Sequence, residues 1–534
     1  MKIFCAQLNP TVGDLEGNKK LVLRAYHEAV ENNAELIMLS ELFLCGYPTE
    51  DLLLRPHFLK EVEETVAEIM PHITDTALLL PTAWVEGDKT YNAALLIQNG
   101  SIKKVLKKSS LPDYDVFDES RLFSAVDEAQ TFTLGGICFG VGICRDIWQP
   151  EVCEKLKQAG AEVILSPNAS PYAQEKLILR EQVAVTCTTI TGVPLIYVNQ
   201  WGGQDELVFD GCSFVMNDDG KQQLLQPAFK NSCFAVNLSK TAAGYTCKAD
   251  TENSNLDAQE MLYSALKTGV KDYFRKTGFG EAIIGLSGGV DSAIVAAIAV
   301  AALGKNNVQA VFLPSVYTSV ESLDDARTLA DNLGISLLEI PIHKTLETVE
   351  KTLDNSGITA TGLAAENLQA RSRGLLLMAL SNQTNALLLT TGNKSEMAVG
   401  YATLYGDMCG AFNPIKDLYK TEVYNLCRYI NSVKHTIPEN IINKEPTAEL
   451  RHNQKDSDSL PPYTILDEIL RLAIEEKLST TEIITRGFKE GIVTHILSLL
   501  RNSEYKRRQA APGIKVSDCH FGKGWRYPIA GRTL

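Results

Sequence analysis

The sequence lacks several features that would each assign it to a particular class of protein. Asp and Glu (65) outnumber Lys and Arg (51), and the net charge of −14 argues against the basic surface of a general nucleic-acid binder. None of the twelve cysteines stands in a Cys-x-x-Cys pair, so paired metal-ligand spacing is absent. The longest apolar run, residues 293–303, is too short to span a bilayer, and "MKIFCAQLNP" lacks the layout of a signal peptide. We therefore expect reduced thiols and a cytoplasmic location, with no nucleic-acid or membrane partner.

The length of the chain indicates more than one domain. With 534 residues, 45% of them apolar and 22% charged, the chain is too long for one ordinary core and has the composition of a globular protein. Residues 239–256 are polar and lack periodicity, which is typical of a connecting segment. We therefore expect a first domain at 1–245, a linker at 246–258 and a second domain at 259–534.

Strand-like and helical segments alternate in both halves, which predicts an α/β protein. The first half begins with a strand at 2–8 and a helix at 18–34, and short β-rich runs near 209–237 suggest an edge hairpin. In the second half, residues 281–304 read as a strand, a glycine-rich turn and a long helix, and further strands follow, as at 308–315. This second pattern predicts a doubly wound parallel sheet.

Three polar residues stand where predicted strands of the first half end: Glu41, Lys108 and Cys144. Strand ends face the ligand crevice of an α/β fold, so the three side chains could converge. Cys144 would attack an amide carbon and form a thioester, Glu41 would carry the proton, and Lys108 would stabilise the oxyanion. A helix beginning at Arg145 would lower the thiol pKa. Taken singly, a cysteine after a strand is more often a packed small hydrophobe, and a lone Glu or Lys is usually solvated.

The sequence stretches around these residues resemble those of the nitrilase superfamily, specifically its glutamine amidohydrolase domain. The matching stretches are "SELFLCGYP", "KKSSLPDYDVFDE", "GICRDIW" and "SPNASPY". The resemblance implies an α-β-β-α sandwich and a Glu-Lys-Cys triad at Glu41, Lys108 and Cys144, with Lys108 preferred to Lys107. It also implies a glutamine site made of Tyr114, Glu119, Ser170 and Lys176. One departure stands beside the nucleophile, where Arg145 occupies a position that is commonly Glu in the family.

The second half carries a glycine-rich loop, "GLSGGVDS", between a predicted strand and helix. Adjacent glycines and a helix N-terminus can bring backbone N–H groups to phosphate oxygens, and Ser287 and Ser292 add hydroxyls. The loop is not a Walker A motif, because it lacks Gly-Lys-Ser/Thr. It matches the pyrophosphate-binding loop of ATP pyrophosphatases, with Asp291 placed to hold Mg²⁺. The alternative is a glycine-rich turn without a ligand.

Most of residues 280–530 resemble the NAD⁺ synthetases. The matching stretches include "ENLQARSRG", "TTGNKSEMAVGYATLYGDMCGAFNPIKDLYKTEV" and "EYKRRQAAPG". The resemblance implies an adenine nucleotide alpha hydrolase-like domain that adenylates deamido-NAD⁺ with ATP and Mg²⁺. Its implied ATP site is Gly285, Leu286, Ser287, Gly288, Gly289, Val290, Asp291, Ser292 and Thr391. Its implied deamido-NAD⁺ site is Asn367, Arg371, Glu396, Tyr401, Ala402, Thr403, Leu404, Asp407 and Lys506, with Asp291 and Glu396 as the metal ligands.

The two halves make chemical sense together. An adenylated carboxylate needs an amine, and a glutaminase on the same chain would release ammonia that need not become ammonium in water. We expect an enclosed path for this ammonia, and the resemblance implies a homo-oligomer in which synthetase domains pair, up to an octamer. Two enzymatic alternatives remain: a related amidotransferase with another acceptor, and an amidase that carries an inactive nucleotide sensor. A third, a non-enzymatic interaction protein, is disfavoured because the catalytic residue types are present.

Overall fold

The chain forms two compact units in a computed structural model, Met1–Asp257 and Ala258–Leu534. The structure describes residues 1–242, 244–249 and 257–531. Strand β15 (Gly244–Ala249) pairs with its neighbour inside the first unit, so the start of the expected linker 246–258 is part of a sheet. Residues 250–256 of that linker lie outside the described residues, and helix α5 (Ala258–Thr277) begins the second unit. The polar composition of 239–249 therefore belongs to an edge hairpin, where one face meets solvent.

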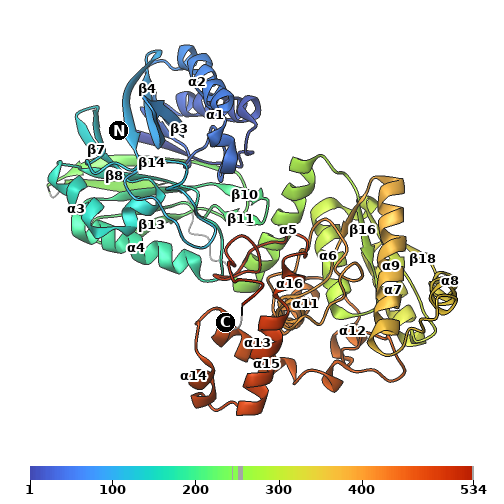
Figure 1. Ribbon diagram of the computed structural model, residues 1–534. Helices are drawn as coiled ribbons and strands as arrows, with labels where there is room; N and C mark the ends of the chain where they lie inside the picture. Colours follow the sequence, from blue (N-terminus) through green and yellow to red (C-terminus); the bar gives the residue numbers. More distant parts are fainter. Residues whose placement is uncertain (243, 250–256, 532–534) are drawn as a thin grey trace. The chain divides into compact units, whose positions relative to one another are not determined.

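Two large sheets build the first unit (Figure 1). The seven-stranded sheet has the order β15-β14-β1-β2-β3-β4-β5 and the six-stranded sheet the order β13-β12-β9-β8-β7-β6. The strands of the first sheet, apart from β15, are β1 (Lys2–Gln7), β2 (Leu36–Met38), β3 (Ala77–Glu86), β4 (Lys89–Gln98), β5 (Ser101–Lys107) and β14 (Ser232–Thr241). Those of the second are β6 (Thr131–Leu134), β7 (Ile137–Val141), β8 (Val163–Asn168), β9 (Leu195–Asn199), β12 (Phe214–Met216) and β13 (Gln222–Leu225), and a separate ribbon pairs β10 (Trp201–Gln204) with β11 (Leu207–Asp210).

The alternation of side chains along the strands explains why two sheets stack. In β1, Ile3 and Cys5 join an apolar cluster that draws on both large sheets, while Phe4 and Ala6 join a second cluster with residues of the flanking helices. Successive side chains of a strand point to opposite faces, so a strand that is apolar at every position must be covered on both sides. The result is a four-layer α-β-β-α sandwich.

Helices cover the outer faces of this sandwich (Figure 1). Helices α1 (Leu15–Glu31) and α2 (Pro56–Ile69) pack on the seven-stranded sheet, and α3 (Pro150–Gln158) and α4 (Lys176–Thr191) pack on the six-stranded sheet. Short 3₁₀ turns η1 (Glu50–Leu54), η2 (Met70–His72) and η3 (Cys144–Trp148) complete the unit. The buried faces of α1 repeat at helical spacing, as at Val22, Ala25, Tyr26 and Ala29.

The region expected as one edge hairpin, 209–237, divides between the two sheets. Strands β12 and β13 do form an antiparallel pair at the edge of the six-stranded sheet. However, "SCFAVNL" is part of β14, which lies in the seven-stranded sheet between β15 and β1. The expectation of a single hairpin was wrong, because β14 pairs with residues more than 220 positions away, as in Lys2 with Asn237, and local spacing carries no sign of that partner.

A four-stranded parallel sheet organises the second unit. Its order is β18-β17-β16-β19, formed by β16 (Ala282–Gly285), β17 (Val308–Phe312), β18 (Ser336–Glu339) and β19 (Leu387–Leu389). The helices and 3₁₀ turns after α5 are α6 (Val290–Leu303), η4 (Lys305–Asn307), α7 (Val320–Leu333), α8 (His343–Asp354), α9 (Leu363–Thr384), α10 (Lys394–Val399), α11 (Lys420–Val433), α12 (Glu439–Asn443), η5 (Asp456–Asp458), α13 (Tyr463–Ile474), α14 (Thr480–Thr485), α15 (Glu490–Asn502) and α16 (Glu504–Arg507).

The strand order of this sheet creates a crevice. The chain moves outward from β16 through β17 to β18, and then returns to place β19 on the other side of β16. The carboxyl ends of strands at such a reversal are where ligands bind in open α/β sheets. Figure 1 draws β16 between α6 and α9, and residues of α9 pack against Ile283, Val311 and Leu388 of the sheet. A separate apolar cluster holds α10, α13 and α15 together.

None of the helices within the described ranges combines the length and apolar character needed to cross a membrane.

Candidate active sites

A buried lysine lies at the centre of the predicted triad in the first unit. Lys108 Nζ is 2.6 Å from Glu41 Oε1 and 2.8 Å from Glu119 Oε2, and the Lys108 and Glu41 side chains are fully buried. Burial opposes the charge of the ammonium, but Glu119 and Glu41 outweigh that cost and raise the pKa of Lys108. Its neighbour Lys107 instead pairs with Glu86 near the surface. The site therefore holds a permanent cation between two carboxylates.

Glu41 is fixed by contacts from three parts of the chain. Besides Lys108, the side-chain amide of Asn92 donates to Glu41 Oε1 (2.8 Å), and the backbone N–H of Ala169 donates to Oε2 (3.0 Å). The same carboxylate lies close enough to the Cys144 thiol to raise its pKa. A carboxylate has room for about four such bonds, so Glu41 is held in one orientation with its remaining capacity directed at the nucleophile.

Cys144 begins the 3₁₀ turn η3, directly after strand β7 and two further residues. Its φ of 49° lies in the left-handed region, which non-glycine residues seldom adopt and which is often found at functional positions. Unlike most of the other cysteines of this unit, which are buried, Cys144 is only partly buried. The turn thus places the partly buried Cys144 within electrostatic range of Glu41 and Lys108.

The expected lowering of the Cys144 pKa is wrong for the free protein. Burial and the charges of Glu41 and Glu119 raise the pKa of the thiol, and Lys108 opposes them only in part. The expected helix at residue 145 is a five-residue 3₁₀ turn, which has little dipole to offer. At neutral pH the sulfur therefore carries its proton, and attack on an amide requires Glu41 to accept that proton.

Asp146 connects the segment after Lys108 with the segment before Cys144. One of its oxygens accepts from the backbone N–H groups of Ser109 (3.0 Å) and Ser110 (2.7 Å), and the other from Ile143 (2.9 Å). Burial raises the pKa of Asp146 to about 7, although these three donors oppose the shift. This carboxyl group fixes the position of the lysine segment relative to the cysteine turn.

The residues predicted to bind glutamine surround this triad. Glu119 is buried and accepts from Tyr47 (2.9 Å) as well as from Lys108. The phenol of Tyr114 accepts a hydrogen bond from Arg145 (3.2 Å), and the ammonium of Lys176 lies 5.1 Å from the centre of the Trp148 ring. The structure thus places Tyr114, Glu119 and Lys176 on segments that adjoin Cys144.

Ser170, the fourth predicted glutamine residue, is held by a buried arginine. Arg180 Nε donates to Ser170 Oγ (3.0 Å), and the same guanidinium forms a bidentate pair with Asp210 at 2.8 and 2.9 Å. Because a guanidinium can only donate, the Ser170 hydroxyl accepts from it and keeps its own hydrogen for another acceptor. Arg180 was not singled out from the sequence, where it is one arginine of an amphipathic helix.

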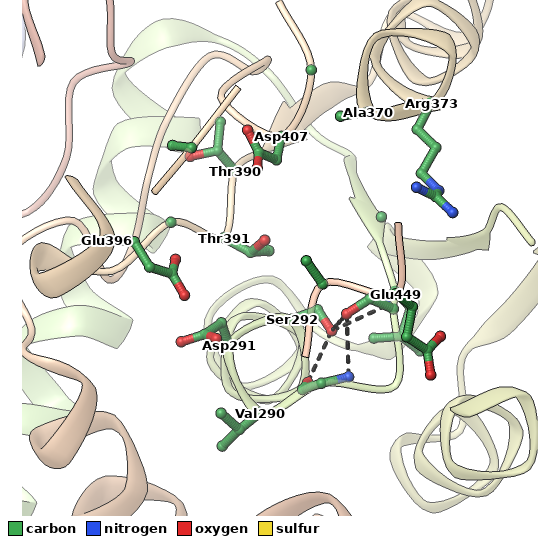
Figure 2. Close-up of a pocket in the computed structure, with 18 of the residues that line it drawn as sticks. Val290, Asp291, Ser292, Ala370, Arg373, Thr390, Thr391, Glu396, Asp407 and Glu449 are labelled. Atoms are coloured by element: carbon green, nitrogen blue, oxygen red, sulfur yellow. Dashed lines mark hydrogen bonds between the residues drawn. The ribbon is translucent and has the colours of Figure 1, made fainter. Parts of the chain in front are cut away.

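The glycine-rich loop of the second unit joins β16 to α6 at the crevice. Gly288 has a φ of 78°, and a side chain there would lie 2.4 Å from the carbonyl oxygen of Ser322, so only glycine fits. Gly289 precedes the helix without a side-chain cap, which leaves the first N–H groups of the 14-residue helix α6 available to a ligand. The Ser292 hydroxyl donates to Gly289 O (3.0 Å), so it also shapes the loop (Figure 2).

A cavity of about 290 Å³ opens beside this loop. Of the predicted nucleotide residues, those in its lining are Gly285, Leu286, Ser287, Gly289, Val290, Asp291, Ser292, Thr391, Glu396, Tyr401, Ala402 and Asp407. Figure 2 shows Asp291, Thr391 and Glu396 close together at one side of the cavity and Arg373 on another. The cavity lies where the ends of β16, β17 and β19 meet, as the reversal of strand order predicts.

Two acidic side chains of this cavity converge on a lysine. The Lys420 ammonium contacts Asp291 Oδ2 and lies 3.2 Å from Glu396 Oε1. Burial raises the pKa of Glu396 to about 8, with Lys420 opposing and Asp291 adding to the shift. Asn393 also donates to Asp291 Oδ1 (2.9 Å). Lys420 is a site residue that sequence reasoning did not single out, because it stands 129 positions from Asp291.

Six predicted residues do not line this cavity: Gly288, Asn367, Arg371, Thr403, Leu404 and Lys506. Gly288 faces Ser322 instead. The others fix the loop that follows α10. Asn367 accepts from the Thr403 hydroxyl (2.9 Å), Arg371 donates to Leu404 O (3.2 Å), and Lys506 donates to the carbonyls of Gly400 and Ala402, both at 2.7 Å.

Comparison with known proteins agrees with this two-site description. A carbon-nitrogen hydrolase family matches residues 2–240, and an NAD synthase family matches residues 262–510. Glutamine-dependent NAD(+) synthetases of Rhodobacter capsulatus and Thermotoga maritima are each 44% identical to this chain, covering 99% and 100% of it and 98% and 99% of their own lengths. This chain belongs to the glutamine-dependent NAD⁺ synthetases. Its activity is that of the family: NAD⁺ formation with ATP and glutamine.

A solved structure supports the assignment. The glutamine-dependent NAD⁺ synthetase of Acinetobacter baumannii, in complex with ADP, is 38% identical over 99% of this synthetase and 98% of its own chain, with a TM-score of 0.80. The synthetase of Cytophaga hutchinsonii, at 24% identity and a TM-score of 0.86, shows the same fold. Both sequence-based expectations, the nitrilase-like sandwich and the parallel-sheet synthetase domain, are confirmed.

Proposed function

We propose that Glu41, Lys108 and Cys144 release ammonia from glutamine, and that the cavity of the second unit uses it. The observation that carries this proposal is the buried Glu41–Lys108 pair at 2.6 Å, whose charges act on the pKa of the neighbouring Cys144 thiol. A buried cation beside a polarised thiol and a fixed proton acceptor is the set of groups that covalent amide hydrolysis needs. These buried charges would contribute little to the stability of the fold, since removing ions from water costs free energy that their pairing must offset.

The chemistry of the first site follows from these positions. The Cys144 sulfur attacks the carboxamide carbon of glutamine as its proton passes to Glu41, and Lys108 stabilises the negative oxygen that forms. Glu41 then returns the proton to the leaving nitrogen, the carbon–nitrogen bond breaks, and ammonia departs from a thioester. Water, deprotonated by Glu41, attacks the thioester and releases glutamate and the free thiol.

The chemistry of the second site requires the binding of ATP and deamido-NAD⁺. The glycine-rich loop and Thr391 line the cavity where the phosphates of ATP would bind the free N–H groups of α6. The nicotinate carboxylate attacks the α-phosphorus, pyrophosphate leaves, and an acyl-adenylate results. Ammonia attacks its carbonyl carbon, AMP leaves, and the amide of NAD⁺ is formed.

The donor set of this cavity fits Mg²⁺ bound together with a nucleotide. The carboxylates of Asp291 and Glu396 converge on a single cation, the Lys420 ammonium, so they can also share a metal. Across residues 1–242, 244–249 and 257–531, no three acidic, histidine or cysteine side chains gather into a complete metal cage. Phosphate oxygens would therefore complete the coordination, as is usual for Mg²⁺. The bound metal would neutralise phosphate charge during adenylation.

We infer that the deamido-NAD⁺ site includes the loop 400–407 and its supports. Tyr401, Ala402 and Asp407 line the cavity, and Lys506 and Arg371 hold that loop from outside it. In this arrangement, Asn367, Arg371 and Lys506 act on the acceptor through the loop that they position.

Two further proposals concern the state of the enzyme. We propose a homo-oligomer that pairs through the synthetase unit, supported by the exposure of Leu363 (71%) and Leu375 (62%) on α9. Light scattering of the wild type and of Leu375→Glu would test it, a smaller particle for the variant being the supporting result.

We also propose a cytoplasmic location, because all twelve cysteines, each within the described residues, are free thiols.

A single variant separates the two sites. Cys144→Ala should lose glutamine-dependent NAD⁺ formation by about 10³-fold or more, because the covalent step is gone, while ammonium-dependent formation continues. Cys138→Ala, on the preceding strand β7, is the matched control and should keep both. Loss of both activities in Cys144→Ala, or of neither, would contradict the proposal.

The same assay with wild-type enzyme addresses the path of ammonia. If ammonia passes between the sites without entering the bulk solution, NAD⁺ formation from glutamine should continue when an enzyme that consumes free ammonia is added.

A further inference from the structure

The residue after the nucleophile, Arg145, is held in place by aromatic rings. Its guanidinium carbon lies 5.2 Å from the centre of the Tyr114 ring and 5.3 Å from that of Trp148, and one N–H donates to the Tyr114 hydroxyl (3.2 Å). Such cation–π contacts hold a guanidinium in place without neutralising it.

Arg145 forms no ion pair with any residue in the described part of the chain. Two other cations of this unit are fully buried and already paired: Lys108 lies between Glu41 and Glu119, and Arg180 pairs with Asp210. Arg145 is only partly buried, and a guanidinium has five N–H donors, of which Tyr114 receives one. A cation of this kind remains able to bind an anion that arrives from solvent.

Tyr114 lies between Arg145 and Cys144 in electrostatic terms, and it contacts the Arg145 guanidinium directly. Burial raises the pKa of Tyr114, Arg145 opposes the shift and Cys144 adds to it, so the phenol lies within electrostatic range of both. Lys176 lies 5.1 Å from the Trp148 ring, so a second ammonium flanks the same indole. In a chain with a net charge of −14, two cations beside the Trp148 ring, four residues after Cys144, favour the binding of an anion there.

We propose that Arg145, together with Lys176 on the shared Trp148 ring, binds the α-carboxylate of glutamine and thereby selects amino-acid amides over simple amides. This inference rests on the proposed glutaminase site. The carboxamide and α-carboxyl carbons of extended glutamine are about 5 Å apart, which is compatible with a cation one residue from the nucleophile. Guanidinium and carboxylate match in a bidentate geometry, so Arg145 fixes the orientation of glutamine as well as its affinity.

The proposal predicts which part of glutamine is required. Glutaramate, which keeps the carboxylate and lacks the α-amine, should be hydrolysed with a kcat/KM near that of glutamine. Glutamine α-methyl ester, which lacks the negative charge, should be hydrolysed with a kcat/KM about 10- to 100-fold lower, as expected for a lost charge-assisted contact.

The decisive experiment measures ammonia release from glutamine and from its α-methyl ester by wild type, Arg145→Met, Arg145→Lys and Arg145→Glu. For Arg145→Met, kcat/KM for glutamine should fall about 10- to 100-fold, mostly through KM, and the value for the ester should change little. Arg145→Lys should recover part of the preference, and Arg145→Glu should show no greater preference for glutamine than Arg145→Met does. Arg55→Met, an exposed arginine at the start of α2, is the control.

The outcomes separate this inference from the proposed function. If Arg145→Met keeps the wild-type ratio between glutamine and the ester, Arg145 does not bind the carboxylate, and the glutaminase proposal stands. If Arg145→Met loses activity towards the ester as well, the residue supports the turn rather than the substrate, and the inference is again overturned. If Cys144→Ala still releases ammonia, the glutaminase site itself is wrong. Ammonium-dependent NAD⁺ formation, measured in every variant, shows that the second unit is folded.

Discussion

The two sites of this synthetase differ in where their charge comes from. In the first unit, Lys108 is buried between Glu41 and Glu119, and every one of these groups belongs to the protein. In the second, a cavity of about 290 Å³ is lined by two carboxylates that share one lysine, with free backbone N–H groups at the helix start. In our proposal, the first site holds its charges before the substrate arrives, whereas the second would gain charge from nucleotide phosphates and a metal.

This difference corresponds to the two kinds of chemistry. A covalent intermediate on sulfur needs a proton acceptor and a cation at fixed distances, which only a rigid protein can supply. Adenylation moves a group between two bound polyanions, so much of the charge travels with the reactants. Variants that change one charge should therefore have different consequences in the two units.

The largest effect should come from Lys108→Met. It leaves Glu41 and Glu119 buried without their cation, which should lower the free energy of unfolding by about 3–5 kcal/mol and abolish glutamine-dependent NAD⁺ formation. Thermal unfolding and assays with glutamine and with ammonium would measure both. Lys107→Met, which removes only a surface ion pair, is the matched control. Retained glutaminase activity in Lys108→Met would refute the view that the first site depends on a built-in cation.

The second unit should respond differently to Asp291→Asn. This change should lower NAD⁺ formation about 10²- to 10³-fold with either nitrogen source, because the carboxylate that faces Lys420 and that we propose as a metal ligand is lost. Stability should change less than in Lys108→Met, since Asn keeps the shape and Glu396 still faces Lys420. Asp331→Asn on the exposed face of α7 is the control. An effect on glutamine-dependent synthesis alone would contradict the assignment.

The protonation of Cys144 offers a smaller and graded test. Because the pKa of the folded thiol lies above its ordinary value, the thiolate is scarce at neutral pH. The rate of inactivation by iodoacetamide should rise about tenfold per pH unit and should still be rising at pH 9. Loss of glutamine-dependent activity reports this rate. A plateau below pH 8 would mean that the Lys108 ammonium lowers the pKa of the Cys144 thiol by more than burial and the carboxylates raise it.

The smallest expected effect concerns Tyr47→Phe. It removes the hydrogen bond to Glu119 and leaves the Lys108 pairs in place, so glutaminase kcat/KM should fall about 3- to 10-fold. Ammonium-dependent synthesis should stay unchanged. A loss of kcat/KM as large as that of Lys108→Met would show that the position of Glu119 depends more on the Tyr47 hydroxyl than on the Lys108 ammonium.

Much of the arrangement of the two sites could be predicted from the sequence, because short local patterns indicate where the site residues stand. The ends of predicted strands indicate Glu41, Lys108 and Cys144 as candidate site residues. A glycine-rich turn between a predicted strand and helix indicates the nucleotide loop. What could not be predicted depends on partners far along the chain. Asn92 meets Glu41 across 51 positions and Lys420 meets Asp291 across 129, and no periodicity links them.

The sequence also misled where one local rule opposed a tertiary one. A helix start after Cys144 suggested an acidic thiol, but the neighbouring carboxylates and burial outweigh a five-residue turn and keep the proton on sulfur. The strand β14 shows the same limit in the fold, because its pairing with β1 joins the two ends of the unit.

One feature of the first unit governs how accurately it can work. Asp146 accepts from the backbone on both the lysine and the cysteine segments, so a displacement of one segment pulls the other with it. Thermal motion can then shift the ammonium and the sulfur together while their separation varies less than either position. Catalysis depends on that separation, so the enzyme can tolerate breathing of the surrounding loops without losing its reactive alignment.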